Sequence, residues 1–377
     1  MVSIAFTGGG TGGHIYPGLA VASRVKERLP CRIFWIGSNT GMDRAIVEEA
    51  GLEFFGIPSG RLRRYFSLKT VPDFFRVLAG FFAARRVLRA QRPLLLFSKG
   101  GFVSVPPCAA AAGLGIPVFT HESDFSPGLA TRINARFAAR GRGRIFAAYG
   151  DTAAFFPPSL RDRVTVSGNP VRSAFRDADA GKGRAFLDIP PGESILLVLG
   201  GSQGARDLNE LVREALPELT KYYTVVHQTG PKNCRDLPAA EKYRPYPYIG
   251  AEMPHVLAAA DLVLGRSGAG TVWECAVAGK PMVLVPLSGS GTRGDQVENA
   301  GYFERRGAAL ALSGGGLDGR LLGETIGRLA LDGERRRAMA AAAAAIGKVD
   351  GAALIAEAVL EIIGEKIGGI YGGNRGY

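Results

Sequence analysis

Two glycine-rich turns carry the strongest chemical signal in this 377-residue sequence. The first, residues 8–14, reads GGGTGGH, and the second, residues 200–205, reads GGSQGA; each follows an apolar run. Glycine lets a backbone turn sharply and approach a ligand closely, and a helix that follows directs free N–H groups and partial positive charge at the turn. Such turns suit phosphate or another anion. One turn in each half of the chain predicts two similar domains that face one cleft.

The first turn also fits the dinucleotide-binding spacing G-x-G-x-x-G, through Gly8, Gly10 and Gly13. An NAD-binding domain should then carry an acidic residue at the end of its second strand to hold the ribose hydroxyls. The second apolar run ends in Ile-Gly-Ser-Asn at residues 36–39 and has none there. A pyrophosphate or sugar site is therefore favoured, with an NAD oxidoreductase as the alternative.

Polar residues that could do acid–base chemistry follow two strand-like runs in the first half. His14 closes the first turn, and histidine titrates near neutral pH, as a proton acceptor requires; the alternative is that it only hydrogen-bonds to the turn. Residues 121–124, His-Glu-Ser-Asp, follow another run, where ligands bind in open α/β sheets. For Asp124 the alternative is a helix N-cap. Lys99-Gly100-Gly101 ends a third run, either as part of the same site or as a simple tight turn.

In the second half, residues 266–274 combine small residues at a helix start with Glu274, which either accepts from ribose hydroxyls or only complements the helix dipole. Residues 295–300 follow a glycine-rich loop that could close over a ligand or form a surface turn.

The four cysteines are scattered, which favours reduced core residues over a disulfide framework or a zinc site. Asp177 and Asp179 lie in a polar stretch without a metal-binding context, so metal independence is expected.

The positive charge of the chain is concentrated in its first half. Residues 1–165 hold 22 Lys/Arg and 10 Asp/Glu, a difference of +12, which equals the net charge of the whole chain. A helix is expected over residues 73–90, with one broad aromatic face beside several arginines; the proposed membrane patch is Phe74, Phe75, Phe81, Phe82 and Arg85. This pattern is typical of an interfacial membrane surface, although a core-facing helix would explain part of it. A nucleic-acid binder is the other alternative for the charge, but no nucleic-acid-binding module is recognisable.

Strand-like runs alternate with helix-like stretches throughout, which predicts two Rossmann-like, doubly wound parallel α/β domains. The seam is expected at residue 168, giving domains over 1–167 and 168–349, with a flexible tail over 368–377. No apolar run is expected to span a bilayer, and no signal peptide is expected. The expected strands are 3–6, 33–36, 54–57, 94–97, 117–120, 145–147, 164–166, 195–199, 224–228, 246–249, 262–264, 282–285 and 308–312.

Seven segments of the chain form a recognisable set, in the order GGGTGGHIYPGLA (8–20), GGFVS (100–104), HE (121–122), GNPVR (168–172), GGSQGA (200–205), RSGA (266–269) and DQ with NA (295–300). Together and in this order they resemble the bacterial family of UDP-N-acetylglucosamine:N-acetylmuramyl-(pentapeptide) pyrophosphoryl-undecaprenol N-acetylglucosamine transferases. The resemblance implies a glycosyltransferase B fold, in which a C-terminal helix, about 350–366, packs back on the first domain. This chain has Ser123-Asp124 where the family usually has Gln-Asn.

The resemblance also implies which residues bind substrates. The first domain would bind the undecaprenyl-diphosphate-linked muramyl pentapeptide, with its diphosphate at Gly9, Gly10, Gly100 and Gly101, on the anionic cytoplasmic face of the inner membrane. The second would bind UDP-GlcNAc, without a cofactor. The implied donor contacts are Thr11, Gly12, Gly13, Asp124, Arg172, Ser202, Gln203, Ile249, Gly270, Thr271, Glu274 and Gln296.

The expected reaction is inverting transfer of GlcNAc to the C4 hydroxyl of the muramyl sugar, which makes lipid II from lipid I. Amide groups near Ser202 and the helix start at 268–271 would stabilise the leaving diphosphate. His14 is the first candidate for the base that removes the hydroxyl proton, followed by Asp124 or Glu122. A nonhydrolysing UDP-GlcNAc epimerase is the alternative that shares this architecture and donor, but it would need neither a lipid acceptor nor a basic aromatic patch.

Overall fold

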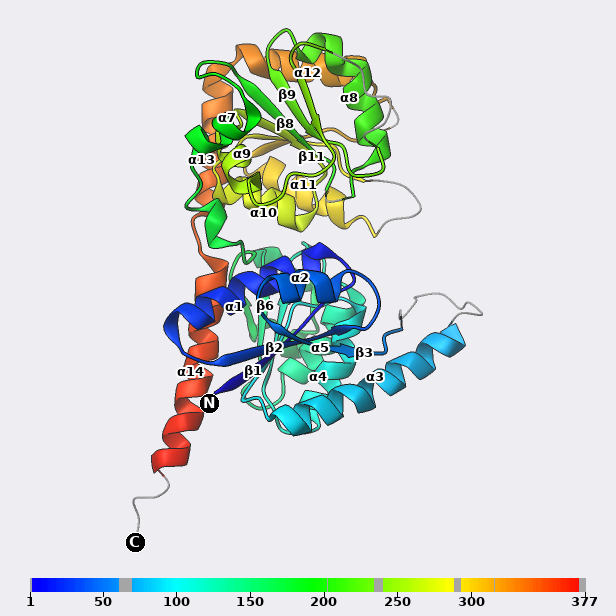
Figure 1. Ribbon diagram of the computed structural model, residues 1–377, viewed down its shortest axis with the longest axis vertical. Coiled ribbons are helices and arrows are strands. Elements are labelled where there is room, and N and C mark those ends of the chain that lie inside the picture. The colour runs from blue at the N-terminus through cyan, green and yellow to red at the C-terminus, as the bar shows by residue number, and fades with distance from the viewer. Residues whose placement is uncertain are drawn as a thin grey trace. The chain divides into compact units, whose positions relative to one another are not determined.

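The computed structural model describes residues 2–60, 70–201, 203–233, 240–287, 293–314 and 316–372. The chain divides into two compact units, one formed by residues 1–172 together with 350–377 and the other by residues 173–349 (Figure 1). The second unit therefore begins at Ser173 rather than at the expected residue 168. The segment 168–172 stays with the first unit because His121 and Ser123 of that unit hydrogen-bond to Gly168 and Asn169.

The first unit is built on a parallel sheet with the strand order β3-β2-β1-β4-β5-β6-β7. The order reverses beside β1, the arrangement of a doubly wound sheet, whose ligands bind at the carboxyl ends of the strands. Its strands within the described ranges are β1 (Ser3–Thr7), β2 (Arg32–Ser38), β3 (Glu53–Ile57), β4 (Leu96–Ser98), β5 (Val118–Glu122), β6 (Arg144–Ala147) and β7 (Val164–Val166). Its α-helices are α1 (Tyr16–Arg28), α2 (Asp43–Glu49), α3 (Thr70–Gln91), α4 (Val105–Ala112), α5 (Leu129–Ala138), α6 (Pro158–Arg161) and α14 (Gly351–Gly372), with 3₁₀ turns η1 (Gly12–His14), η2 (Phe102–Ser104) and η3 (Gly150–Phe155).

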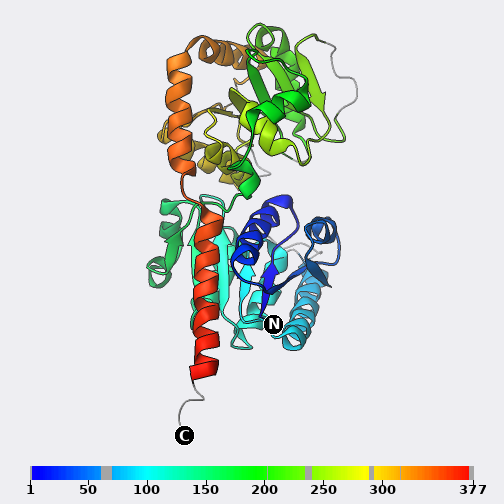
Figure 2. The same ribbon diagram turned by 60° about the vertical axis from the view of Figure 1, so that its left-hand side comes forward.

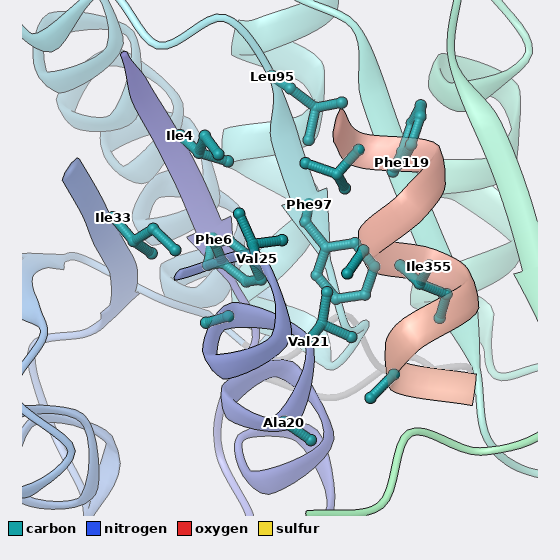
Figure 3. Close-up of a cluster of buried hydrophobic side chains, with 14 of the residues drawn as sticks. Ile4, Phe6, Ala20, Val21, Val25, Ile33, Leu95, Phe97, Phe119 and Ile355 are labelled. Carbon is teal, nitrogen blue, oxygen red and sulfur yellow. The ribbon is translucent and has the colours of Figure 1, made fainter. Parts of the chain in front are cut away.

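Both faces of this sheet are buried. In β1, Ile4 and Phe6 belong to a core cluster with α1 and α14, whereas Ala5 belongs to a second cluster with α3, α4 and α5. Successive side chains of a strand point to opposite faces, so strands covered by helices on both sides are apolar throughout. Figure 3 shows Phe97 and Val21 in the first of these clusters, with Ile355 of α14.

The second unit has a parallel sheet with the order β10-β9-β8-β11-β12-β13. α8 and α12 pack on one face of it, through a cluster that includes Val212 and Ile326. The strands described there are β8 (Ile195–Leu199), β9 (Thr224–Gln228), β10 (Tyr243–Tyr246), β11 (Leu262–Gly265), β12 (Met282–Leu284) and β13 (Ala309–Ala311). The helical elements are η4 (Ser173–Phe175), α7 (Ala180–Leu187), α8 (Arg206–Leu219), α9 (Met253–Ala259), α10 (Ala269–Val277), α11 (Asp295–Arg305), α12 (Gly319–Leu331) and α13 (Gly333–Gly347).

The prediction of two doubly wound parallel α/β domains is confirmed, and each expected strand has a counterpart. β10 is the one displaced strand, because it covers Tyr243–Tyr246 rather than 246–249. Pro245 lies inside it, which an edge strand tolerates because a proline there need not donate to a neighbour. Ile249 is as buried as a strand residue, but its N–H bonds to the side chain of Gln228 instead of a strand ladder.

The C-terminal helix α14 completes the core of the first unit (Figure 2). Ion pairs and a hydrogen bond fasten its polar side, and they join Arg24 to Asp350, Arg28 to Glu357, Arg142 to Glu365, Arg144 to Glu361, and Lys366 to the carbonyl of Leu94. The helix runs to Gly372, so the first half of the expected flexible tail is helical, and residues 373–377 lie outside the described ranges.

An apolar stretch that is long enough to cross a membrane does occur, contrary to the expectation from the sequence. Residues 333–366 are long and apolar enough to cross a membrane, judged by length and composition alone. They form two separate helices, α13 and α14, and Ile355, Val359 and Ile363 of α14 are buried in the core of the first unit. Core helices of proteins without a membrane span meet the same criteria.

Candidate active site

The first glycine-rich turn leads from β1 through η1 into α1, and a buried carboxylate holds it in place. The Oδ1 atom of Asp43, at the start of α2, accepts a hydrogen bond from Gly10 N at 2.9 Å, and its Oδ2 atom accepts one from Ser38 N at 3.0 Å. The approach is so close that a Cβ atom at Gly9 would lie 2.0 Å from Asp43 Oδ2. Thr11 and Gly13 are exposed on the outer side of the turn.

Asp43 also explains why the turn does not have the chemistry of an NAD site. An acidic side chain does reach the end of β2, although it follows the strand by five positions. It is fully buried, and both oxygens are engaged by backbone N–H groups, so it is turned inward to the protein rather than toward ribose hydroxyls. Sequence reasoning missed this residue; the signal was an acidic side chain in the first turn of the helix that follows the second strand.

The second pair of glycines in the first unit touches the first turn. A Cβ atom at Gly101 would lie 2.7 Å from Gly9 O and 3.1 Å from His14 Cδ2. The structure therefore brings together the expected acceptor residues Gly9 and Gly101 with the expected base His14, which is half-buried at the end of η1.

Asn134 of α5 supports this pair from inside the unit. It is fully buried, and its Nδ2 donates to Ser98 Oγ at 3.1 Å and to Ser104 Oγ at 2.8 Å. Ser98 Oγ accepts from Gly100 N at 3.2 Å, and Ser104 Oγ donates to Gly101 O at 2.8 Å. One amide thus braces the backbone of both glycines through two hydroxyls.

Glu122 organises the turn that follows β5. Its Oε1 accepts from Ser123 N at 2.9 Å and Asp124 N at 3.0 Å, and its Oε2 accepts from Gly128 N at 3.1 Å. The side chain is 5% exposed. Both carboxylate oxygens are therefore used to hold residues 123–128, which favours a structural role over that of a base. Asp124 projects from this turn and is only half-buried.

Lys99, between β4 and Gly100, is a buried cation next to these acidic residues. It is 1% exposed, and burial lowers its pKa to about 8, although the charges of Glu122 and Asp124 oppose the shift. Burial also lowers the pKa of His121 well below its usual value, and the positive charge of Lys99 adds to this effect. The sequence placed Lys99-Gly100-Gly101 either in the site or in a simple tight turn, and it did not predict that Lys99 would be a buried cation.

Arg172, an expected donor residue, is the last residue of the first unit. Its guanidinium carbon lies 4.9 Å from the ring centroid of Tyr16, two residues beyond His14. A cation over an aromatic face is a favourable contact. Arg172 is thereby placed beside the first glycine-rich turn, and the expected donor set is divided between the two units.

The second glycine-rich turn lies between β8 and α8 and is packed tightly against the end of β9. Gly201 O accepts from Gly204 N at 3.1 Å, and a Cβ atom at Gly204, where φ is +74°, would lie 1.9 Å from Thr229 O. Gln203 is exposed, whereas Ser202 lies outside the described residues. The N-cap of α8 is Ala205, whose side chain has no oxygen to cap the helix, so amides of its first turn are not capped there.

The N-terminus of α10 lies near the N-terminus of α8. Gly268 is the N-cap, and a Cβ atom at Gly268 or Gly270 would meet nothing within 4 Å. Just before it, Arg266 donates to Val285 O at 2.9 Å and forms an ion pair with Asp207 of α8. Burial would raise the pKa of Asp207, but the hydrogen bond and charge of Arg266 outweigh burial and lower it.

Hydrogen bonds join α11 to Ser267, just before the N-terminus of α10. Ser267 Oγ donates to Gln296 O at 2.6 Å, and Asn299 Nδ2 donates to Ser267 O at 3.1 Å. The side chain of Gln296 accepts from Leu287 N at 2.8 Å through Oε1. Of the donor residues expected here, Thr271 and Glu274 are half-buried in α10, and Gln296 lies on α11 next to its start.

The aromatic face of α3 points away from the core. Phe74, Phe75 and Phe82 are about 60% exposed, and Leu78 is 44% exposed. Phe81 is partly buried against the core cluster that contains Ala84 and Leu88, so the core-facing interpretation holds for Phe81 alone. Residues 61–69, which include four basic residues and two aromatic ones just before the helix in the sequence, lie outside the described ranges.

Other candidate metal ligands have structural roles or stand apart. Asp179 caps α7 by accepting from Gly181 N and Lys182 N, at 2.7 and 3.1 Å. In the parts of the chain that the structure describes, groups of three or more His, Cys, Asp or Glu that could hold a metal ion do not occur. Cys31, Cys108 and Cys275 are free thiols, and Cys234 lies outside the described part.

Comparison with known proteins agrees with this architecture. The chain is 51% identical to the UDP-N-acetylglucosamine--N-acetylmuramyl-(pentapeptide) pyrophosphoryl-undecaprenol N-acetylglucosamine transferase of Treponema denticola, covering 83% of this chain and 84% of the relative. The crystal structure of Acinetobacter baumannii MurG matches with a TM-score of 0.72 at 25% identity, over 96% of this chain and all of that one. A UDP-GlcNAc 2-epimerase from Neisseria meningitidis has the same fold, with a TM-score of 0.68 at 16% identity, over 96% of this chain and all of that one.

Two family domains cover most of the chain. Residues 4–141 match the glycosyltransferase family 28 N-terminal domain, and residues 195–357 match the C-terminal domain of the same family. These two matches, and the 51% identity to the relative from Treponema denticola, show that the chain belongs to glycosyltransferase family 28 and, within it, to the UDP-N-acetylglucosamine--N-acetylmuramyl-(pentapeptide) pyrophosphoryl-undecaprenol N-acetylglucosamine transferases.

Proposed function

We propose that this protein transfers N-acetylglucosamine from UDP-GlcNAc to the C4 hydroxyl of the muramyl sugar of undecaprenyl-diphosphate-MurNAc-pentapeptide. The product is lipid II, the disaccharide precursor of peptidoglycan. The observation that carries this proposal is the 51% identity, over 83% of the chain, to a relative named for this transfer. The two glycine-rich turns at the carboxyl ends of β1 and β8 are the local features that fit a diphosphate-containing donor and acceptor.

The two units have different roles in this proposal. The first unit binds the lipid-linked acceptor, whose diphosphate lies at Gly9, Gly10, Gly100 and Gly101. The contact between Gly101 and Gly9 supports a common site for these four residues. The second unit binds most of the UDP-GlcNAc, and Thr11, Gly12, Gly13, Asp124 and Arg172 contribute from the first.

The donor site in the second unit uses the turn 200–205 and the start of α10. The acceptor oxygen attacks C1 of GlcNAc with inversion, the bond from C1 to the diphosphate oxygen breaks, and UDP leaves. Open helix starts with backbone amides can stabilise the charge that develops on the diphosphate. The N-caps Ala205 and Gly268 support this role, because neither has a side-chain oxygen that could cap its helix. Ser202, Gln203, Ile249, Gly270, Thr271, Glu274 and Gln296 complete the proposed donor set.

His14 is the proposed base that takes the proton of the C4 hydroxyl. It lies beside Gly101, where the acceptor diphosphate would bind, and imidazole suits proton transfer near neutral pH. Asp124 is the second candidate. Glu122 ranks last, because three backbone N–H groups occupy its carboxylate.

The exposed face of α3 is the proposed membrane contact. Phe74, Phe75 and Phe82 expose most of their surface, and Phe81 and Arg85 lie next to them on the helix. Apolar rings beside basic side chains bind the interface of an anionic bilayer. We therefore place the protein peripherally on the cytoplasmic face of the inner membrane, with nucleic acid not among its partners.

A transfer assay tests the proposal. Purified protein is incubated with labelled UDP-GlcNAc, with and without the polyprenyl-diphosphate-linked muramyl pentapeptide. The expected result is labelled lipid product and one UDP per sugar transferred, only in the presence of the acceptor. Conversion of UDP-GlcNAc into an epimer without the acceptor would assign the protein to the epimerases, and folded protein that labels no lipid would refute the transfer.

A further inference from the structure

The side chain of Gln228 joins two separate segments of the proposed donor site. Gln228 is the last residue of β9, between β8 and β10, and it is 4% exposed. Its Nε2 donates to Gly201 O at 3.2 Å, and its Oε1 accepts from Ile249 N at 2.9 Å. The two partners are 48 positions apart in the sequence and do not share a strand ladder.

The amide of Gln228 satisfies both partners at once. A carbonyl oxygen needs a donor and a backbone N–H needs an acceptor, and glutamine presents one of each at the end of the same side chain. The identity of the partners also fixes which end of the amide is nitrogen. Glutamate would set a carboxylate oxygen against Gly201 O, and methionine would offer neither bond at the same length.

The neighbouring backbone packs closely around this connection. Gly201 O also accepts from Gly204 N, so Gln228 bonds to the carbonyl that closes the second glycine-rich turn. A Cβ atom at Gly230 would lie 2.2 Å from Gln203 O, so the strip after β9 is in direct contact with that turn. On its other side, Thr229 N donates to Tyr246 O at 2.9 Å, just before Ile249.

We infer that Gln228 is a positioning residue for the nucleoside diphosphate donor, because it sets the turn 200–205 and the backbone of Ile249 at a defined separation. This inference rests on the proposed function, in which Ser202, Gln203 and Ile249 contact the donor. A buried hydrogen bond lost at this point moves two contact segments at once, whereas the acceptor site in the first unit is not touched. The expected signature is a change in donor binding without a change in acceptor binding.

Gln228→Glu and Gln228→Met test this assignment, with Tyr243→Phe as the matched control. Tyr243→Phe also removes one buried hydrogen bond from the same sheet, the 3.0 Å bond between its hydroxyl and His227 Nδ1, but it touches neither donor segment. For each protein the measurements are thermal unfolding, UDP affinity by calorimetry, and the KM values for UDP-GlcNAc and for the lipid acceptor.

Both Gln228 variants should raise the donor KM and the Kd for UDP by at least about tenfold, with the acceptor KM within twofold of wild type. The control should lose similar stability without these changes. The inference would be overturned if the donor KM were the same in the variants and in wild type, or if it rose equally in the control. Loss of the fold in both Gln228 variants would overturn it as well. Wild-type protein that binds UDP but transfers no sugar would instead refute the proposed function, and the UDP affinities would still decide the role of Gln228.

Discussion

The carboxylate of Asp43 accepts one hydrogen bond from the backbone of Gly10 and another from the backbone of Ser38, so it joins the first glycine-rich turn to the end of the second strand of its sheet. Burial raises the pKa of Asp43, and the N–H groups of Gly10 and Ser38 oppose the shift. A buried carboxylate is stable only where donors surround it. The N–H group of Gly10 is therefore a donor that the turn supplies to the protein interior.

Asp43→Asn should weaken this turn. The amide can still accept from Gly10, but its NH₂ group then faces the N–H of Ser38, so one buried donor loses its partner. We expect a loss of about 1–3 kcal/mol in the free energy of unfolding and a rise in the acceptor KM, measured by thermal unfolding and transfer kinetics. Glu48→Gln, on the exposed side of α2, is the control and should change neither. Unchanged stability and acceptor KM in Asp43→Asn would refute the role of this contact.

His14→Ala should lower kcat by roughly 10²-fold or more if the imidazole is the base. The fold should survive, because His14 lies at the end of a short 3₁₀ turn and is not part of the buried core. Steady-state kinetics across pH and a thermal unfolding curve check both statements. Asp124→Asn is the comparison variant and should lose less turnover. Near-normal turnover in His14→Ala would move the base to another residue.

Phe74→Asp combined with Phe82→Asp should release the protein from anionic vesicles. Both rings are 60% exposed, so the charges cost little folding free energy but remove apolar contact with the bilayer. Co-sedimentation with phosphatidylglycerol vesicles measures the binding. The control is Leu331→Asp, a side chain that is 76% exposed and lies in the other unit; it should bind as wild type does. Equal vesicle binding by all three proteins would exclude the α3 face as the contact.

Lys99→Met should stabilise the protein most at and below neutral pH. The pKa of Lys99 is lowered from 10.5 to about 8, so the unfolded chain binds more protons between these values and wild-type stability rises with pH there. The advantage of the variant should therefore shrink by up to about 3 kcal/mol between pH 8 and 10.5. Chemical unfolding at several pH values measures it. A difference that stays constant over this range would show that Lys99 keeps an ordinary pKa.

Transfer should continue in excess EDTA. If backbone amides at the starts of α8 and α10 stabilise the leaving diphosphate, a divalent cation is not required for that charge. Initial rates with EDTA and with added Mg²⁺ test this directly. A rate that falls with EDTA and recovers with Mg²⁺ would assign the leaving-group charge to a metal ion.

Most strands could be predicted because they are short apolar runs bounded by turn residues, and the central strands of both sheets are buried along their whole length. β10 was predicted three residues too late because Ile249 is apolar and buried, as strand residues are. Its N–H group bonds to the side chain of Gln228 and not to a neighbouring strand, and no local sequence pattern reveals that contact. The glycine-rich turns were visible because their signal is local. Asp43 and Gln228 were missed because each acts on backbone groups of distant segments, so only the folded chain shows what they hold.

The aromatic face of α3 marks another limit of sequence reasoning. Periodicity places Phe74, Phe75, Leu78 and Phe82 on one side of a helix, but it does not say whether that side meets the core or the solvent. The core contact is made by Ala84 and Leu88, with Phe81 and Val87 partly buried against the same cluster. Aromatic and aliphatic residues lie on both sides of the helix, so the sequence alone does not say which side is buried.

Because α14 supplies Ile355, Val359 and Ile363 to a core that begins with Ile4, the chain must be almost entirely synthesised before its first unit can close. Residues 173–349 are contiguous and leave the ribosome earlier, so the later-encoded unit can mature while the N-terminal one still waits for its last helix. A stop codon near residue 350 would therefore damage the half of the protein that was made first.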